Sequence, residues 1–217
     1  MTQSGAGFTL SAMFDPQVYA ARRAALVREL AERGARVGLV VVPGNHEAPM
    51  NYPDNTYRFR QDSSFLYFFG LAEPDLAATL DLDSGAATLY CGELSQDDLV
   101  WTGPRPNRAE RARLCAADAH ADTDRLASDL AAATTAGRPI LYLPPYRADT
   151  RAELASLLGL PLEAVNGKAS MDLIRAVIAL REIKDSGEVA QIDQAVDRSV
   201  AMHQAVIRAA RPGVTEA

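Results

Sequence analysis

The sequence predicts an α/β fold, a mixed β-sheet flanked by helices, with a helical extension toward the C-terminal end. Three observations predict it. Residues 76–92 have the pattern of a β-hairpin, other apolar runs are separated by helical segments, and only helical patterns follow about residue 165. Strands joined partly by a hairpin and partly by helices favour a mixed sheet rather than a purely antiparallel one.

The chain begins with a predicted helix and a predicted buried strand. In "FDPQVYAARRAALVRELAERG", Asp15 can cap the helix, Pro16 suits its first position and Gly34 can end it. The following "VGLVVVPG" is a short β-branched run, which is typical of a strand covered on both faces. A long polar loop, Asn45 to Asn55, comes next.

The aromatic run "SFLYFFG", residues 64–70, is interpreted as a second strand. Alternation places Phe65, Tyr67 and Phe69 on one face and Leu66 and Phe68 on the other. Because both faces are apolar, the strand is expected in the middle of the sheet. In "LAATLDLDSGAATLYCG", two strands flank a turn in which Gly85 supplies the positive φ.

The second half alternates helices with one strand. Residues 107–118, 122–137 and 148–159 have helical patterns, and "RPILYLPPY" is predicted to be a strand that ends at Pro-Pro. The composition changes near residue 165. We therefore expect one domain over residues 1–168 and the start of another over 169–217.

The segment after residue 168 predicts two helices. Ser170 can cap the first, and a capping box begins the second with Asp185 and Glu188. The second helix carries an apolar stripe that needs a partner surface, formed by Val189, Ile192, Val196, Val200 and Ile207. Pro212-Gly213 is expected to end it.

Composition excludes several classes of function. The 217 residues carry a formal net charge of -6, which argues against a general binder of nucleic acid or anionic membranes. Cys91 and Cys115 have no ligand partners at zinc spacing, and His46, His120 and His203 are isolated along the chain. No phosphate-binding loop, nucleophile motif, secretory signal or membrane-length apolar run is present, so a cytoplasmic location is expected.

Three motifs resemble those of the Xaa-Pro aminopeptidase (aminopeptidase P), prolidase and creatinase family. "YRFRQDSSFLYFFGLAEPD", Tyr57 to Asp75, is similar to the family's aromatic-rich segment. "VWTGPRP" is similar to its loop after the hairpin, and "LREIKDSGEVAQIDQAV" resembles its junction with the catalytic domain. The resemblance implies the family's N-terminal domain, plus the first helices of a truncated "pita-bread" catalytic domain.

The resemblance also implies an activity that this chain would not perform alone. The family removes the N-terminal residue that precedes proline, using two divalent metals, usually manganese, held in the pita-bread domain. None of those ligands matches a residue here, so no catalytic or metal-binding residue is assigned and this chain is expected to bind no cofactor. The N-terminal domain is expected to form homo-oligomer contacts and to close the active site of its own or a neighbouring subunit over a peptide substrate.

Two residues match substrate-facing positions of the family. Asp54, just before the aromatic segment, can meet a substrate α-amine, and Trp101 offers a flat wall for a proline ring. A plain loop or interface role is the alternative for each. A stand-alone, non-catalytic oligomerisation or binding module also stays open for the whole chain, as do fragments of a prolidase or a creatinase-like enzyme. "WTGPRP" carries Pro104 and Pro106 where many relatives have charged residues.

Overall fold

The computed structural model describes residues 13–93, 99–101 and 103–215. The chain divides into two compact units, Met1–Leu180 and Arg181–Ala217, which we call unit 1 and unit 2. Each is described by itself. Unit 1 contains the sheet and both apolar cores, whereas unit 2 consists chiefly of one long helix.

The described part of unit 1 contains a five-stranded mixed sheet, which confirms the predicted fold class. The strand order is β4-β3-β2-β1-β5. β1 pairs antiparallel with β2 and parallel with β5, and β3 pairs antiparallel with β2 and parallel with β4. The strands are β1 (Leu39–Pro43), β2 (Ala77–Asp81), β3 (Ala87–Tyr90), β4 (Ala119–Ala121) and β5 (Ile140–Leu141).

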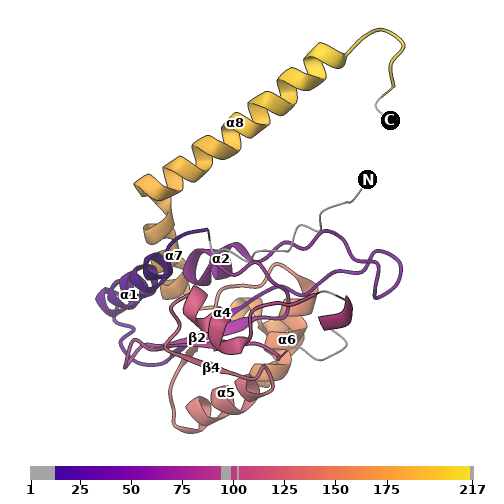
Figure 1. Cartoon of the computed structure of the whole chain (residues 1–217). Coiled ribbons are helices and arrows are strands. Elements are labelled where there is room, and N and C mark those ends of the chain that lie inside the picture. The colour runs from indigo at the N-terminus through magenta and orange to yellow at the C-terminus, as the bar shows by residue number, and fades with distance from the viewer. Residues whose placement is uncertain (1–12, 94–98, 102, 216–217) are drawn as a thin grey trace. The chain divides into compact units, whose positions relative to one another are not determined.

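Helices cover both faces of this sheet (Figure 1). Alternate residues of β1 enter different cores: Val40 and Val42 face one, and Leu39 and Val41 face the other. The first core is closed by α1 (Pro16–Glu32), α2 (Ser63–Phe69), α4 (Arg108–Leu114) and α7 (Met171–Glu182). The second is closed by α5 (Arg125–Thr135) and α6 (Ala148–Leu158), with the short 3₁₀ turns Leu162–Ala164 and Asn166–Lys168 following α6.

The local signals at the start of the chain operate as predicted. The Asp15 carboxylate accepts a hydrogen bond from the Gln17 amide at 2.8 Å, and Pro16 is the first residue of α1. Residues 39–42 of β1 are all buried. In the hairpin, Gly85 has φ of 76° and the Asp81 carboxylate accepts hydrogen bonds from the turn amides.

The interpretation of "SFLYFFG" as a strand is wrong, because Ser63–Phe69 form the helix α2. The Asp62 carboxylate caps its first turn by accepting from the amides of Ser64 and Phe65. Gly70 ends it in the left-handed conformation. Phe65, Phe68 and Phe69 follow at helical i, i+3, i+4 spacing and enter the core. The aromatic run is therefore a buried helix face, not a central strand.

Two smaller features also differ from the sequence expectation. The strand β4 is the next element after the helix α4 and differs from the sequence expectation, because three residues are too few to show the alternation that identifies a strand. Residues 99–101, expected in a loop, adopt a short helical turn. Neither difference changes the class of the fold.

The helix α7 contributes to the core of unit 1. Leu173, Ala176 and Val177 are buried in the first core, and the Ser170 hydroxyl accepts from the Leu173 amide at 3.2 Å, as the capping prediction requires. Unit 1 therefore extends to Leu180, beyond the composition change near residue 165.

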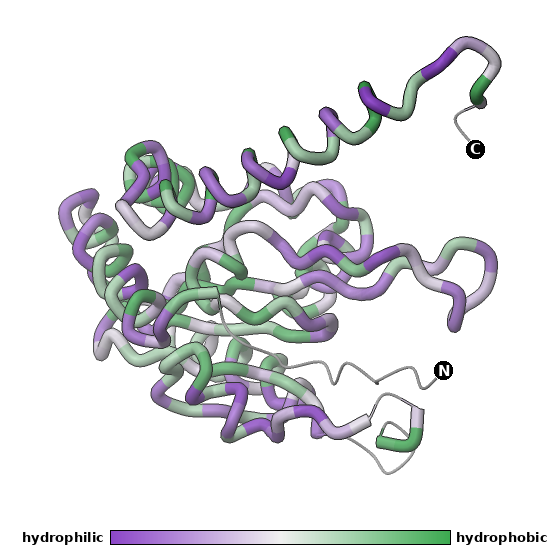
Figure 2. The backbone as a smooth tube through the Cα atoms, turned by 45° about the horizontal axis from the view of Figure 1, so that its top comes forward, coloured by the Kyte–Doolittle hydropathy of each residue, from purple (hydrophilic) through white to green (hydrophobic). Residues whose placement is uncertain are grey.

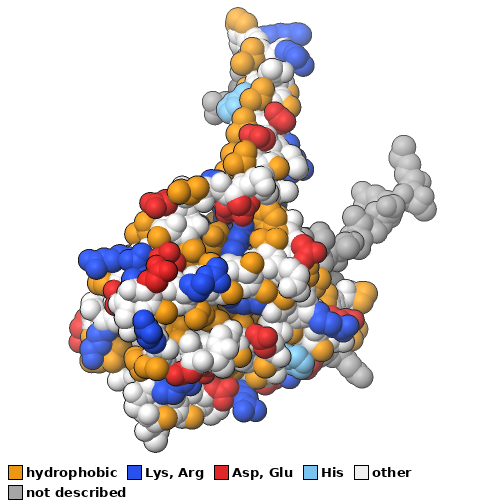
Figure 3. Space-filling model, turned by 90° about the vertical axis from the view of Figure 1, so that its left-hand side faces the viewer, with side chains coloured by type: hydrophobic (Ala, Val, Ile, Leu, Met, Phe, Trp, Pro, Cys, Tyr) orange, Lys and Arg blue, Asp and Glu red, His pale blue; other side chains and the backbone are white. Residues whose placement is uncertain are grey.

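The helix of unit 2, α8 (Ser186–Ala209), begins with the predicted capping box of Asp185 and Glu188. It buries none of its residues. Hydrophobic side chains run along it between charged ones (Figure 3).

Candidate functional site

Asp54 lies in a tight turn of the loop that joins β1 to α2, residues 44–62. The loop doubles back on itself, with a bridge between Pro49 and Thr56 and a hydrogen bond from the Asn55 amide to the Tyr52 carbonyl at 3.1 Å. Pro53 occupies the second position of this four-residue turn, where a fixed φ near −65° is favoured. The local sequence thus holds Asp54 in an exposed turn.

Trp101 is 87% exposed and has apolar neighbours in Leu99 and Val100, the latter 80% exposed. The amide of Gly103, which has φ of 74°, donates to the Leu99 carbonyl at 3.1 Å and closes this short turn. The 44–62 loop and the 99–101 turn extend toward the same side of unit 1 (Figures 1 and 2). No hydrogen bond of the described residues joins Asp54 to Trp101 directly.

The base of the Asp54 loop is closed by buried amide groups. The Gln61 side chain, 7% exposed, accepts from the Asn45 amide at 2.6 Å and donates to the Glu73 carbonyl at 2.6 Å. The Asn45 side chain donates to the Arg60 carbonyl at 2.9 Å. A Cβ at Gly44 would approach the Gln61 side chain to 3.0 Å and the Leu76 carbonyl to 2.5 Å, so this close contact requires glycine.

Two arginines of α4 bind the backbone directly after β3. Arg111 Nη1 donates to the Gly92 carbonyl at 3.2 Å, and Arg108 Nε donates to the Cys91 carbonyl at 2.9 Å. Arg111 also binds Glu73 Oε2, with Nε at 3.0 Å and Nη2 at 2.9 Å. The side chains of this pair are only 5% and 7% exposed, and burial makes such a pair depend on close hydrogen bonding.

His46, at the edge of the Asp54 loop, is close to two carboxylates. Its Nδ1 lies 2.6 Å from Asp75 Oδ1, and its Nε2 lies 3.2 Å from Glu153 Oε2. These two hydrogen bonds, with Asp75 the stronger influence, raise the pKa of His46 to about 10. The protonated ring therefore joins three segments that are distant in the sequence, which nothing in the local sequence of this histidine indicated.

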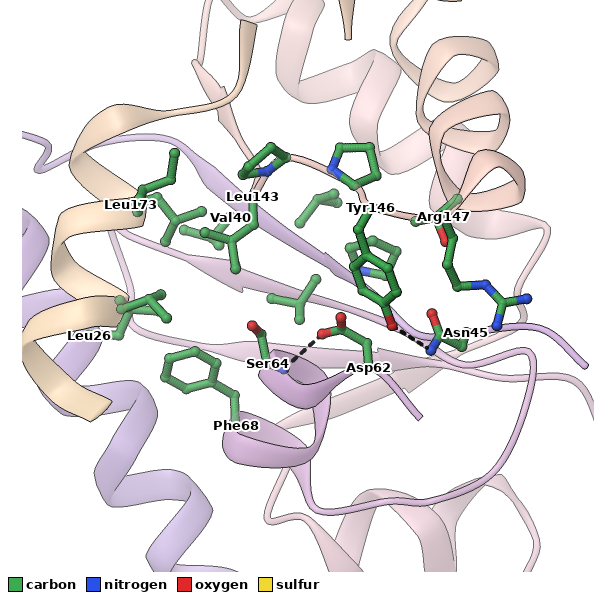
Figure 4. A pocket seen from close by; sticks show the side chains of 18 of the residues that line it. Leu26, Val40, Asn45, Asp62, Ser64, Phe68, Leu143, Tyr146, Arg147 and Leu173 are labelled. Atoms are coloured by element: carbon green, nitrogen blue, oxygen red, sulfur yellow. Dashed lines mark hydrogen bonds between the residues drawn. The ribbon is translucent and has the colours of Figure 1, made fainter. Parts of the chain in front are cut away.

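A cavity of about 270 Å³ lies between β1, α1, α2 and α7 (Figure 4). Its body is apolar, with Leu26, Val40, Phe68 and Leu173 among the lining residues. The polar groups at its mouth are engaged within unit 1. Asn45 donates to the Tyr146 hydroxyl at 3.1 Å, Asp62 accepts from the start of α2, and Arg147 binds the Asp149 carboxylate. The Arg147 hydrogen bond is also the main cause that lowers the pKa of Asp149 to about 2.

Metal chemistry finds no support within the part of the chain that the structure describes. No cluster of three or more His, Cys, Asp or Glu side chains there could hold a metal ion. The two cysteines are buried, and burial raises the pKa of each thiol, in the case of Cys115 to about 11. Among the described helices, none has the length and apolarity needed to span a bilayer.

Comparison with known proteins shows which sequences this chain is similar to. The sequence model of "Aminopeptidase P, N-terminal domain" matches residues 19–142. A probable Xaa-Pro aminopeptidase of Arthroderma benhamiae is 29% identical over 206 residues, which are 93% of this chain and 38% of that protein. The corresponding protein of Ajellomyces capsulatus is 26% identical over 95% of this chain and 42% of its own length. The chain thus spans about two fifths of these curated relatives.

Solved structures of aminopeptidases share the fold. Aminopeptidase PepP of Pseudomonas aeruginosa superposes with a TM-score of 0.75 at 21% identity, over 93% of this chain and 46% of that chain. Aminopeptidase P from E. coli, in its low-pH form, gives a TM-score of 0.75 at 20% identity, over 94% of this chain and 47% of its own. The family match over more than half of the chain, on a mixed sheet with the expected motif order, shows that this chain belongs to the aminopeptidase P N-terminal domain family.

Proposed function

We propose that this chain is the N-terminal part of a metal-dependent Xaa-Pro aminopeptidase, which removes the residue that precedes proline at a peptide's N-terminus. Its role is to present the Asp54 loop and the Trp101 turn to the active site of its own or a neighbouring subunit. The observation that carries this proposal is the 87% exposure of Trp101 in the 99–101 turn, a segment that extends toward the same side of unit 1 as the 44–62 loop. Leu99, Val100 and Trp101 are exposed next to one another, and contiguous exposed apolar side chains of this kind mark a surface that contacts a ligand or a partner.

The chemistry of the two side chains suits the ends of such a substrate. Asp54 would attract the positively charged α-amine of the first residue, and its position in a turn lets the carboxylate reach outward. Trp101 would cover the flat face of the proline ring and exclude water from it. Both act by binding and orienting the peptide. The bond cleavage itself is assigned to a two-metal centre outside this chain, where bridging hydroxide would be the nucleophile.

The first test concerns the 217-residue chain itself. It should release no amino acid from a peptide with proline in second position, with or without added manganese, because no metal-binding cluster lies within its described residues. Turnover would be followed by amine-reactive fluorescence. The proposal would be contradicted if the purified chain showed turnover that a chelator abolished and that added manganese restored.

The second test concerns Trp101 in the longer protein that contains this chain. Trp101→Ala should lower kcat/KM for a Xaa-Pro tripeptide by about tenfold, equivalent to ~1.4 kcal/mol of lost contact, while the melting temperature stays unchanged. Val100→Ala is the matched control, since Val100 is also exposed and apolar and is adjacent in sequence. An equal effect of both substitutions, or none of either, would favour a plain surface or oligomer contact.

The third test removes the charge of Asp54 and keeps the size of its side chain. Asp54→Asn keeps the shape of the side chain and should raise KM for peptides with a free α-amine, with little effect on peptides whose N-terminus is acetylated. If the variant behaves like the natural protein toward both peptides, the stand-alone or interface interpretation of this loop becomes the better one.

A further inference from the structure

The cavity between β1, α1, α2 and α7 takes no part in the proposed function. Its volume is about 270 Å³, and all of the residues that line it belong to unit 1. An engineered protein cavity of about 150 Å³ holds one benzene molecule, which has six carbon atoms. By that measure this cavity has room for on the order of ten non-hydrogen atoms. It therefore suits a small molecule and is too small for a folded partner.

The two ends of this cavity differ in polarity (Figure 4). One end is apolar, and its side chains include Leu26, Val40, Phe68 and Leu173. The other end carries side-chain oxygen atoms, which belong to Asn45, Asp62, Ser64 and Tyr146. The cavity opens to solvent beside Tyr146 and Ile178, which line it and are 74% and 56% exposed. An occupant therefore needs an apolar body with one polar group at its end.

The polar end of the cavity offers hydrogen-bond acceptors. Asp62 caps α2 with one carboxylate oxygen, since Oδ1 accepts from the amides of Ser64 and Phe65 at 2.8 and 3.0 Å. Asn45 Nδ2 donates to the Tyr146 hydroxyl at 3.1 Å, so this amide group presents its Oδ1 as an acceptor. Within the described part of the chain, no hydrogen bond involves Asp62 Oδ2, Asn45 Oδ1 or the Ser64 hydroxyl. Three oxygen atoms are thus available to a ligand that donates hydrogen bonds.

The charges at this end favour a cation. Arg147 lines the cavity, but its Nε lies 3.0 and 3.1 Å from the two carboxylate oxygens of Asp149, and its Nη2 donates to the His46 carbonyl at 3.2 Å. Asp149 therefore offsets the charge of this guanidinium. Asp62, in contrast, forms no ion pair with any described residue. Its carboxylate is the group at the cavity that still lacks a counter-charge, and a ligand cation would supply one.

We propose that this cavity is a binding site for a small primary amine with an apolar body. The ammonium group has three N–H donors, which match the oxygen atoms of Asp62, Asn45 and Ser64. The apolar body occupies the other end, where it packs against Val40 and Phe68. This site is separate from Asp54 and Trp101, so the inference does not depend on the proposed peptide cleavage.

The test is an NMR titration of the ¹⁵N-labelled 217-residue chain at pH 7 with 2-phenylethylamine. This probe has about the size that the cavity admits, and we expect saturable shift changes with a Kd of about 0.1–1 mM. 2-Phenylethanol has the same shape without the charge and should bind about tenfold more weakly. The anion 3-phenylpropionate should show no saturation. Equal affinities for the amine and the alcohol, or no saturable binding of the amine, would overturn the proposal.

Two variants place the amine in this cavity. Asp62→Asn removes the charge but keeps a residue that caps helices well, so it should weaken amine binding about tenfold and leave the alcohol unaffected.

A second variant fills the cavity and does not depend on the cap of α2. Ile174 is half-buried on α7 and lines the cavity, so Ile174→Trp should abolish binding of both compounds. Met171→Trp is the matched control, because Met171 lies on the same helix, is 57% exposed and does not line the cavity. Melting temperatures without ligand would show that each variant is folded. Unchanged amine affinity in Ile174→Trp, or an equal loss in Met171→Trp, would place the amine outside this cavity and refute the site.

Discussion

At the scale of single residues, His46 shows how folding gives a side chain its charge state. Alone in the sequence, this histidine would titrate near its ordinary value of about 6.5. In the fold its two ring nitrogens meet Asp75 and Glu153, and these contacts raise its pKa to about 10. The imidazolium stays charged at neutral pH and ties the Asp54 loop to the start of β2 and to α6.

This shift predicts a pH-dependent stability. A raised folded-state pKa stabilises the protein fully below the unfolded value of about 6.5, and that contribution is lost as the pH rises through 10. Because the His46 side chain is 36% exposed, solvent reduces the contribution to about 1 kcal/mol. His46→Gln should therefore lower the free energy of unfolding by that amount at pH 6 and by much less at pH 10.

Urea denaturation at pH 6 and pH 10 would measure this loss in the free energy of unfolding. His120→Gln, at an exposed position of β4, is the matched control and should change the free energy of unfolding by less than about 0.5 kcal/mol at both. An equal loss for His46→Gln at pH 6 and pH 10 would mean that the ring acts by packing, not by charge.

At the scale of elements, the helix α2 depends on the residues at its two ends. Asp62 caps it and Gly70 ends it with φ of 69°, directly against the ring of Tyr19, which is 1% exposed. A Cβ at Gly70 would lie 2.0 Å from that ring, a separation that no rotamer change of a buried side chain relieves. A helix of only seven residues forms here because the cap at Asp62, the left-handed glycine at position 70 and the buried aromatic face all favour a helix.

Two glycines of similar conformation provide a matched test. Gly70→Ala should lower the free energy of unfolding by at least ~3 kcal/mol, since steric overlap adds to the strain of a positive φ. Gly85 has φ of 76° in the hairpin turn with open space around it, so Gly85→Ala should cost only ~1–2 kcal/mol. Chemical denaturation of both variants would decide. Equal losses would mean that backbone strain alone accounts for Gly70.

At the scale of the whole molecule, the exposed stripe of α8 predicts association. Val189, Ile192, Val196 and Val200 are 44–52% exposed, and Ile207 is 73% exposed. Full burial of such side chains gains about 1.5–3 kcal/mol each, and a lone helix of this length is only marginal in water. We expect the 217-residue chain to self-associate through this face, as a symmetric contact between two copies.

Light scattering would compare the 217-residue chain with a version shortened to residues 1–182. The shorter chain keeps Leu173, Ala176 and Val177 in the core, which a cut at residue 168 would remove. Only the longer chain should show a mass that rises with concentration. Val196→Asp should abolish the rise, whereas Gln191→Asp, on the opposite helical face by its spacing, should not. Identical monomer masses for all four proteins would show that the stripe needs no second copy.

The sequence determined the features that local chemistry controls. The cap at Asp15, the hairpin turn at Gly85 and the capping box at Asp185 were predicted and are confirmed, because each depends on a few adjacent residues. The mixed sheet and the family were predictable too, since motif order along the chain is itself a sequence property. The family resemblance indicated Asp54 and Trp101 as substrate-facing residues, and in the structure both are exposed.

Only the tertiary structure decided which periodicity the aromatic run would follow and which distant groups would meet. Over seven residues an apolar run fits a strand or a helix, and packing against α1 selected the helix. His46 lies 29 positions from Asp75 and 107 from Glu153, and Gln61 and Arg111 meet through Glu73 across separations of 12 and 38. Contacts over such distances leave no periodic trace in a single sequence, because the sheet order, not the local pattern, brings their segments together.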